Sequence, residues 1–220
     1  MRWNEQDGVR WLEADLPGAK AAFSTRSAGS AKESHAPLAA ALGISPGRIV
    51  SGRQVHGTEL AFHDGTGPAA LEVDGHVIGA PGPVGLVYAA DCLPVAVAGP
   101  GGVAVLHCGW RGLAAGIIAR GVEAVGATHA AIGPGIGPCC YEVGDDVLDA
   151  FAGLGPGVAA GRMLDLPEAA RRLLRESGVE EVESAGLCTR CEEELFFSHR
   201  RDAGPGRQAG LVWIVDRRQG

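Results

Sequence analysis

Four short segments of the chain gather histidine, cysteine and arginine among glycines. They are RQVHG (53–57), ADCLP (90–94), LHCGWRG (106–112) and IGPGIGPCCYE (132–142). Three of them place a histidine or a cysteine at the end of an apolar run, just before a turn. A side chain there can leave a sheet and point into a cleft while the strand holds its backbone. Imidazole and thiolate groups in that position can bind a metal ion, or act as a base and a nucleophile.

Taken one at a time, these residues also have simpler interpretations. A single histidine such as His56 is more often a surface or core residue than a ligand, and Cys92 in an apolar run is typical of a small buried side chain. Cys188 and Cys191 have the spacing of a zinc-binding pair, but one such pair does not make a zinc site. The glycine-rich run 133–137 lacks the lysine of a phosphate-binding P-loop, which excludes that motif.

The segments are far more specific in combination. QVHG, ADCLPV, HCGWRG, GPGIGPCCYEV, LCTRC and FFSHRRD follow one another between Arg53 and Asp202. This series resembles the laccase-domain family, also called the multicopper polyphenol oxidase family, which includes purine nucleoside phosphorylases and relatives of a peptidoglycan editing factor. Ser24, Thr25 and Arg26 add a weaker match. The resemblance implies one α+β domain over residues 1–220, with mixed β-sheets sandwiched by helices in α/β/β/α-like layers.

The resemblance also implies a zinc site in which His56, Cys92 and His107 are both the metal ligands and the catalytic residues. We expect their ligand atoms to lie within about 4 Å of one another. Two imidazoles and one thiolate leave a fourth zinc position open for water or substrate, which is the pattern of a catalytic site. Copper is the alternative metal. A multicopper oxidase needs many paired His-x-His ligands, whereas the chain has seven histidines and no such pair.

The activity implied by the resemblance is phosphorolysis of adenosine, inosine and methylthioadenosine, together with deamination of adenosine. The expected partners are therefore a purine nucleoside and phosphate. Arg111 and either Arg200 or its neighbour Arg201 are candidate substrate-binding residues because phosphate requires cationic donors, and the resemblance adds Arg26. Cys140 is a fourth candidate, because the glycines around it let the backbone approach a ligand. We expect no disulfide between Cys139 and Cys140, since adjacent Cα atoms lie about 3.8 Å apart, below the usual disulfide range of about 4.4–6.8 Å.

Two other functions remain open from the residues. Cys92 can act as a thiolate nucleophile with His107 as its base, in an amide hydrolase that edits a cell-wall precursor. The chain can also be a non-catalytic binding protein that zinc stabilises. One thiolate cannot be a metal ligand and a free nucleophile in the same catalytic cycle. The metal content of the protein therefore distinguishes the amide hydrolase from the zinc enzyme. Turnover of substrate distinguishes the non-catalytic binding protein from both enzymes.

The chain departs from the family pattern at two places. Cys108 stands where family members usually carry alanine, which adds a thiol beside the expected ligand His107. The segment after Arg26, over residues 27–37, is shortened and has a different sequence from the usual one. Both departures lie next to residues that the resemblance assigns to the site.

The elements that must position these residues are mostly short strands. Strand-like apolar runs cover residues 9–14, 19–24, 49–55, 58–62, 84–90, 93–98, 103–108 and 209–215. The turn Gly99-Pro-Gly-Gly102 predicts a hairpin between the runs on either side of it. A helix is expected over 113–125, and a second follows Asp165 as its cap, with Pro167 in its first turn and Gly178 at its end. The elements alternate without a regular βαβ rhythm, which favours an α+β fold with mixed sheets.

Composition excludes several classes of function. The chain of 220 residues has 19 basic and 26 acidic side chains, a net charge of −7 that is spread evenly, so we expect no nucleic-acid partner. It has no run of about 18 apolar residues, so no membrane span is expected. The N-terminus lacks the apolar segment of a secretory signal, and we expect a cytoplasmic protein. The six cysteines are then thiols or metal ligands rather than a disulfide framework. The oligomeric state stays open.

Overall fold

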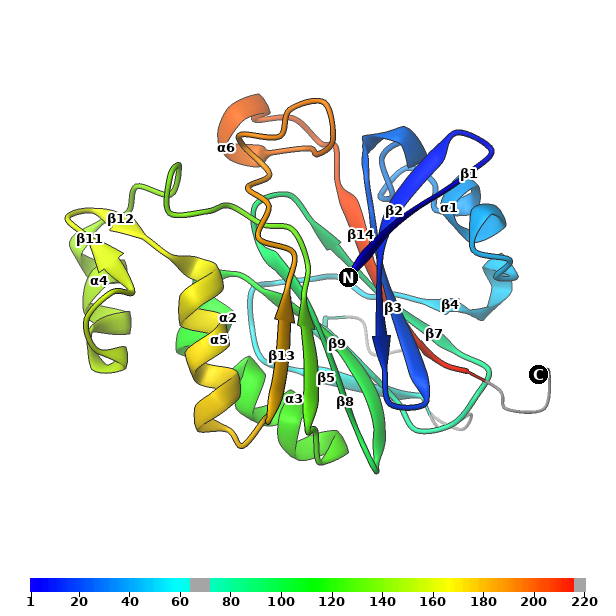
Figure 1. Cartoon of the computed structure of the whole chain (residues 1–220), viewed down its shortest axis with the longest axis horizontal. Coiled ribbons are helices and arrows are strands. Elements are labelled where there is room, and N and C mark those ends of the chain that lie inside the picture. Colours follow the sequence, from blue (N-terminus) through cyan, green and yellow to red (C-terminus); the bar gives the residue numbers. More distant parts are fainter. Residues whose placement is uncertain (64–71, 216–220) are drawn as a thin grey trace.

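Two six-stranded β-sheets form the centre of the computed structural model, which describes residues 1–63 and 72–215 (Figure 1). The first sheet has the order β1-β2-β3-β14-β7-β4. Its strands are β1 (Arg2–Gln6), β2 (Val9–Leu16), β3 (Ala19–Ser24), β14 (Gln208–Ile214), β7 (Val84–Ala89) and β4 (Ile49–Val50). All neighbours are antiparallel except β4 and β7, so the sheet is mixed.

The second sheet is mixed as well, with the order β13-β10-β8-β9-β6-β5. Its strands are β13 (Glu181–Ser184), β10 (His129–Ile132), β8 (Leu93–Gly99), β9 (Gly102–Cys108), β6 (Gly75–Ile78) and β5 (Leu60–His63). The pairs β10–β13 and β5–β6 are parallel, and the others are antiparallel. A small separate ribbon pairs β11 (Ala159–Ala160) with β12 (Met163–Leu164).

Helices cover the outer faces of both sheets. They are α1 (Ala36–Ala41), α2 (Trp110–Ala114), α3 (Ile117–Val125), α4 (Asp145–Phe151) and α5 (Leu166–Glu176). The short helix α6 (His199–Asp202) has no buried residue and lies beyond one end of the sheets, at the top of Figure 1. Figure 1 shows α2 to α5 on the side of the second sheet and α1 on the side of the first. Each helical layer shares an apolar cluster with the sheet that it covers. The α/β/β/α-like layering that the resemblance implies is therefore the observed α+β fold.

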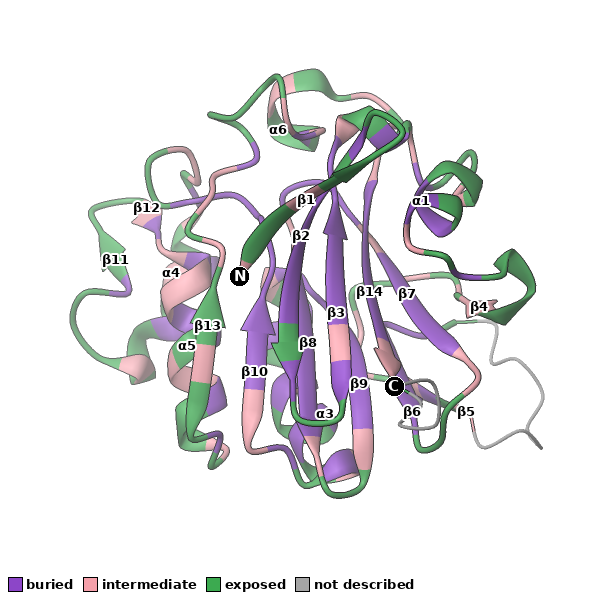
Figure 2. Cartoon of the chain, turned by 45° about the vertical axis from the view of Figure 1, so that its right-hand side comes forward, coloured by how far each residue is buried: buried purple, intermediate pink, exposed green. Residues whose placement is uncertain are grey.

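The core between the two sheets is built from small and branched side chains. Figure 2 shows the central strands buried along most of their length. In β8 the alternating positions serve two cores, because Ala96 and Ala98 face the first sheet while Val95 and Val97 face the helices. Such burial on both faces explains why the strand is a nearly continuous apolar run rather than an alternating one. Phe23 and Ile78 are large, fully buried side chains of this core.

Several elements confirm the expectations from the sequence. The hairpin forms between β8 and β9, with Leu93 opposite Cys108 and Gly99 opposite Gly102. Helix α5 begins after Asp165, whose side chain accepts a hydrogen bond from the backbone N–H of Glu168 at 2.9 Å. Strands β2, β3, β7 and β14 also lie where the apolar runs indicated, with ends that differ by up to two residues.

Two expectations were wrong in detail. The helix expected over 113–125 is two helices, α2 and α3, because Gly116 between them adopts φ of 93° and breaks the helical path. The strand expected over 49–55 stops at Val50. Further along this segment, the side-chain amide of Gln54 takes the place of a strand partner, bonding the backbone N–H and carbonyl of Tyr88 at 2.7 Å each. Strands β1, β6, β10 and β13 were not anticipated.

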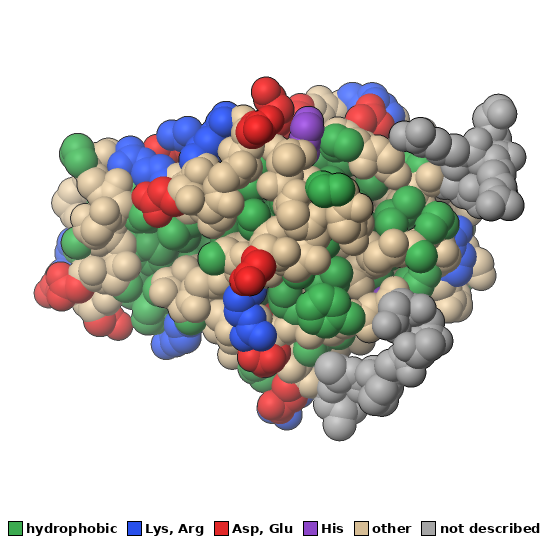
Figure 3. All heavy atoms as spheres, turned by 90° about the horizontal axis from the view of Figure 1, so that it is seen from below, with side chains coloured by type: hydrophobic (Ala, Val, Ile, Leu, Met, Phe, Trp, Pro, Cys, Tyr) green, Lys and Arg blue, Asp and Glu red, His purple; other side chains and the backbone are tan. Residues whose placement is uncertain are grey.

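Charged side chains of both signs are interspersed on the face shown in Figure 3. That distribution agrees with the even spread of charge along the sequence. Within residues 1–63 and 72–215, no helix has both the length and the apolar character needed to cross a membrane.

The turn end of β8 packs directly against the end of α3, which makes Gly99 a test of the fold. A Cβ atom at Gly99 would lie 2.1 Å from the carbonyl oxygen of Gly126 and 2.5 Å from that of Val125. Since both contacts are with backbone, Gly99→Ala must displace the hairpin or the helix. We expect it to lower the free energy of unfolding by about 1–3 kcal/mol in urea titrations. Gly79→Ala is the control, because a Cβ there meets nothing within 4 Å. Equal unfolding midpoints for the two variants would contradict this packing.

Candidate functional site

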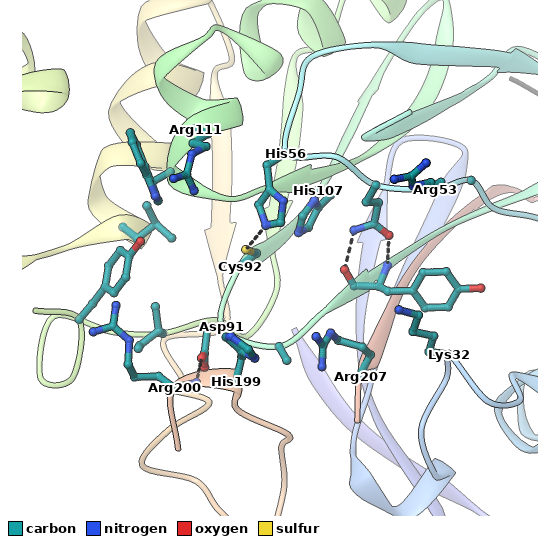
Figure 4. Close-up of a pocket in the computed structure, with 18 residues that line it drawn as sticks. Lys32, Arg53, His56, Asp91, Cys92, His107, Arg111, His199, Arg200 and Arg207 are labelled. Carbon is teal, nitrogen blue, oxygen red and sulfur yellow. Dashed lines mark hydrogen bonds between the residues drawn. The ribbon is translucent and has the colours of Figure 1, made fainter. Parts of the chain in front are cut away.

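Three segments bring His56, Cys92 and His107 together at one end of the two sheets. His56 lies in the loop after β4, Cys92 directly precedes β8, and His107 is near the end of β9. Their ligand atoms all lie within 4.8 Å of one another, a wider bound than the expected 4 Å. Cys92 Sγ is 3.8 Å from His56 Nε2, and the two imidazole centroids are 4.9 Å apart (Figure 4). The structure thus places two imidazoles and one thiol around a common point.

Gly109 makes this close approach possible. It follows β9 directly opposite Cys92, because the register pairs Leu93 with Cys108. A Cβ atom at Gly109 would lie 2.8 Å from His56 Cδ2 and 3.0 Å from Cys92 Sγ. The glycine of the HCGWRG segment therefore leaves room for the His56 ring and the Cys92 sulfur to meet.

A buried carboxylate, that of Asp74, holds two of the three residues in place. It accepts hydrogen bonds from the backbone N–H groups of Val55, His56 and Gly57 at 2.8–3.0 Å. It also binds Nδ1 of His107 at 2.8 Å, so the other ring nitrogen of His107 is the one free to act toward Cys92. His56 has φ of 61°, an uncommon value for a non-glycine residue, and the three backbone bonds stabilise that turn.

The charges of these groups depend on one another. Burial raises the pKa of the Asp74 carboxyl, but hydrogen bonds from His107 and from the backbone of Gly57 and Val55 outweigh this effect. The net result is a lowered pKa, so the carboxyl stays ionised. Burial likewise raises the pKa of the Cys92 thiol, and the neighbouring His107 and His56 more than reverse this, lowering it to about 6. For His107 burial lowers the pKa, while the Cys92 thiolate and Asp74 raise it to about 9. Near neutral pH the metal-free site therefore holds a thiolate beside an imidazolium.

These residues fit zinc. Two imidazole nitrogens and a thiolate sulfur are donors that zinc accepts, and three protein ligands leave one position open. Asp74 supplies the carboxylate–histidine contact that orients a metal-binding imidazole. The neighbouring Cys108 does not belong to this set, because it is fully buried in the core and burial raises its thiol pKa well above the usual range.

The three residues line a cavity of about 670 Å³. Its other charged or aromatic lining residues are Lys32, Arg53, Tyr88, Asp91, Trp110, Arg111, Tyr141, His199, Arg200 and Arg207. Five of the lining residues are Lys or Arg, whereas only one is a carboxylate (Figure 4). That carboxylate, Asp91, is already bound to the Thr189 hydroxyl and to the backbone N–H of Arg200, each at 2.7 Å. The cavity therefore favours an anionic ligand.

Aromatic rings hold two of the arginines at the cavity wall. The guanidinium of Arg111 lies 4.5 Å from the centroid of Trp110, and that of Arg200 lies 5.4 Å from the centroid of Tyr141. Burial, and next the Cys92 thiolate, raise the pKa of the Tyr141 hydroxyl to about 12, so it remains a hydrogen-bond donor. Flat rings beside cationic groups can contact both a planar base and an anion.

Of the four residues expected to bind substrate, Arg111 and Arg200 line the cavity and the other two do not. Arg26 instead binds the carboxylate of Asp202 at 2.9 Å and the carbonyl of Phe196 at 3.1 Å. These partners occupy its guanidinium, and Arg26 is not among the residues that line the cavity. Cys140 lies beside another cysteine, Cys191, with the two sulfurs 3.4 Å apart.

Other residues of the site were missed from the sequence. Asp74 belongs to none of the quoted motifs, and the surrounding sequence, LEVDG (71–75), carries no local signal of its role. Lys32 and Arg207 come from loops far apart in the chain, and both line the cavity. Lys32 lies in the shortened segment 27–37, so that segment still contributes a cation to the site. His199, in the FFSHRRD segment, could have been singled out as the histidine beside Arg200.

Comparison with known proteins identifies the family of the chain and proteins of similar fold. A family profile described as "Multi-copper polyphenol oxidoreductase laccase" matches residues 23–215. "Purine nucleoside phosphorylase YfiH" of Escherichia coli (strain K12) is 36% identical over 188 residues, which cover 80% of this chain and 77% of the relative. A "Purine nucleoside phosphorylase" of Deinococcus radiodurans is 40% identical over 197 residues, covering 83% and 75%. The crystal structure of YlmD from Geobacillus stearothermophilus matches with a TM-score of 0.81 at 30% identity, over 97% of this chain and 99% of that one.

Replacement of Asp74 by asparagine tests its role in the site. If the asparagine oxygen keeps the contacts to His107 and His56, its NH₂ group must face the N–H groups of Val55 and Gly57, donor against donor. We expect Asp74→Asn to cost about 1–3 kcal/mol of stability and to weaken Zn²⁺ binding by about 10- to 100-fold. Urea unfolding and competition with a chelator measure the two effects.

The control for Asp74→Asn is Glu59→Gln, which changes an exposed carboxylate that binds Arg120 away from the cavity. It should leave Zn²⁺ affinity unchanged. Wild-type affinity in Asp74→Asn would show that the carboxylate does not position a ligand.

Proposed function

The chain belongs to the multi-copper polyphenol oxidoreductase laccase family, and on that premise we propose that it is a zinc-dependent purine nucleoside phosphorylase. Its substrates are adenosine, inosine and methylthioadenosine, with phosphate as the second reactant, and it also deaminates adenosine. The observation that carries the proposal is the convergence of His56, Cys92 and His107 on the wall of a cavity rich in arginine. Copper chemistry of the type in the family's name needs more histidine ligands than the seven in this chain.

The cationic residues serve the phosphate. In phosphorolysis a phosphate oxygen bonds to C1′ of the ribose while the bond from C1′ to the purine nitrogen breaks, and the base leaves with the electron pair and takes up a proton. Arg111 and Arg200 hold the phosphate by charge-assisted hydrogen bonds, because both line the cavity and both are braced on aromatic rings. Positioning phosphate next to C1′ lowers the barrier by making the substitution effectively unimolecular.

The apolar part of the wall serves the base. Trp110, Tyr141, Ile136 and Leu166 line the same cavity and offer flat and branched surfaces to a purine. The Tyr141 hydroxyl stays protonated at neutral pH and can donate a hydrogen bond to an acceptor of the base. A volume of about 670 Å³ lies within the usual range for small-ligand sites, about 300–1,000 Å³.

His56, Cys92 and His107 would hold the zinc, with Asp74 keeping His107 oriented. When bound, zinc would lower the pKa of a coordinated water to about 7 and so provide hydroxide for deamination at the purine C6. Cys92 can enter such a site already ionised, because its neighbours lower its pKa to about 6.

One observation favours a second candidate, a cysteine-type amide hydrolase that edits a cell-wall precursor. Asp74, His107 and Cys92 are in contact one after another, because the carboxylate binds the imidazole and the imidazole lies beside the thiolate. That order is the one used for an activated cysteine nucleophile. His56 argues for the metal, because a nucleophilic pair has no need of a second imidazole 3.8 Å from the sulfur.

Cys92→Ser distinguishes the two candidates. A neutral hydroxyl is a much poorer zinc donor than a thiolate, so we expect the variant to lose one equivalent of zinc per chain and most of its inosine phosphorolysis. Elemental analysis and phosphate-dependent release of hypoxanthine measure this. Cys108→Ala is the matched control and keeps both, because that buried thiol is outside the ligand set. Unchanged zinc with lost labelling by a thiol reagent favours the nucleophile, and unchanged zinc with full phosphorolysis rejects the zinc site.

Arg111→Ala tests the phosphate contact. Loss of one hydrogen-bonded charge costs about 1.5–3 kcal/mol, which corresponds to an increase of about 10- to 100-fold in KM for phosphate. Initial rates of inosine cleavage at varied phosphate concentration measure it. Arg120→Ala is the control, since that arginine binds Thr58 and Glu59 on the surface. Equal KM values for phosphate in the two variants would remove Arg111 from the proposed binding site.

A further inference from the structure

A second cluster of potential ligands lies outside the cavity and consists of four cysteines. Cys139 and Cys140 follow β10, and Cys188 and Cys191 follow β13. Their sulfur atoms all lie within 4.8 Å of one another. Cys191 Sγ is 3.5 Å from the sulfur of Cys139 and 3.4 Å from that of Cys140. Four bonds of about 2.3 Å to one tetrahedral zinc ion place sulfurs about 3.8 Å apart, so small shifts would accommodate the ion.

The fold brings these two cysteine pairs together through parallel strand pairing. Strands β10 and β13 run side by side, with Ile132 opposite Ser184, so the segments that leave their ends start at the same edge of the sheet. Gly135 and Cys188 continue the pairing as an isolated bridge. Two cysteine pairs about fifty residues apart in the chain are therefore held against each other by backbone bonds.

The backbone near the sulfur atoms can stabilise thiolates and leaves room for them. Gly137 points its N–H at Cys188 Sγ, 3.3 Å away. A Cβ atom at Gly137 would lie 3.3 Å from Cys188 Cβ and 3.5 Å from Cys139 Sγ, so a side chain there would crowd the cluster. Hydrogen bonds from backbone N–H groups stabilise the charge of metal-bound sulfur.

We propose that Cys139, Cys140, Cys188 and Cys191 bind one Zn²⁺ as a closed four-thiolate site with a structural role. Four protein ligands fill the tetrahedral coordination of zinc and leave no position for water or substrate, in contrast to the site at Cys92. Thiolate is the ligand type that favours zinc over hard cations such as Mg²⁺ and Ca²⁺. Binding of the ion releases the thiol protons to solvent.

The ion fastens two segments that build the wall of the cavity. Cys140 precedes Tyr141, and the carbonyl of Glu142 accepts a hydrogen bond from Arg200 at 3.0 Å. From the other segment, Thr189 binds Asp91, the residue next to Cys92. The two segments contain little regular structure between β10 and α4 and between β13 and α6. Zinc would supply the order that a helix or strand supplies elsewhere.

Zinc content in a Cys92→Ser background tests the proposal, because that substitution removes the thiolate of the cavity site. We expect one equivalent of zinc per chain in Cys92→Ser and none in the double variant Cys92→Ser/Cys191→Ser. Cys92→Ser/Cys108→Ala is the matched control and should keep the one equivalent, since Cys108 is a buried thiol outside the cluster. Should Cys191→Ser prevent folding, Co²⁺ added to the Cys92→Ser protein must give the intense visible absorption of tetrahedral cobalt bound by thiolates.

Stability supplies a second readout. A strong chelator should lower the melting temperature of Cys92→Ser and speed amide hydrogen exchange over residues 186–198, and it should do neither in the double variant. A Cys92→Ser protein without zinc overturns the proposal, whether mass spectrometry finds four free thiols or a disulfide between Cys191 and Cys139 or Cys140. None of these measurements involves nucleosides. The phosphorylase activity can therefore be rejected while the four-cysteine zinc site is confirmed, and the zinc site can be rejected while the activity is confirmed.

Discussion

The Asp74 carboxylate is the group on which the geometry of the cavity site depends. It is fully buried, and its two oxygens accept hydrogen bonds from three successive backbone N–H groups and from His107. One residue thereby fixes both the unusual turn at His56 and the ring orientation of His107. Moving a carboxylate from water into the protein interior costs free energy. The three backbone N–H groups and His107 offset that cost, and they hold two distant segments at the same point.

The site lies where the chain passes from one sheet to the other. The QVHG segment connects β4 of the first sheet with β5 of the second, and Asp91 and Cys92 connect β7 with β8. The chain returns from β13 to β14 through the segment that carries Cys188, Cys191 and Arg200. Such crossings lie outside the regular strands, so they can present side chains to a cavity while the sheets hold their ends.

The tertiary structure also redistributes charge. The chain as a whole is acidic, with a net charge of −7, yet five Lys or Arg residues and one carboxylate line the cavity. Loops and the short helices α2 and α6, from distant parts of the sequence, supply these cations. The cavity therefore attracts anions, although the composition of the chain gives no sign of this local positive charge. The four-cysteine cluster lies beside the same wall and joins two of the loops that build it.

The sequence by itself determined the local features of this protein. Continuous apolar runs and a glycine-rich turn predicted the β8–β9 hairpin, Asp165 predicted the start of α5, and the ordered motifs indicated the family and the three residues around Cys92. Only the tertiary structure decided that Asp74 joins His107, that Arg26 turns to Asp202, and that Cys140 faces Cys191. Capping and strand patterns act over a few residues and leave a local signal. The parallel pairing of β10 with β13 joins residues about fifty positions apart, and no short stretch of sequence encodes it.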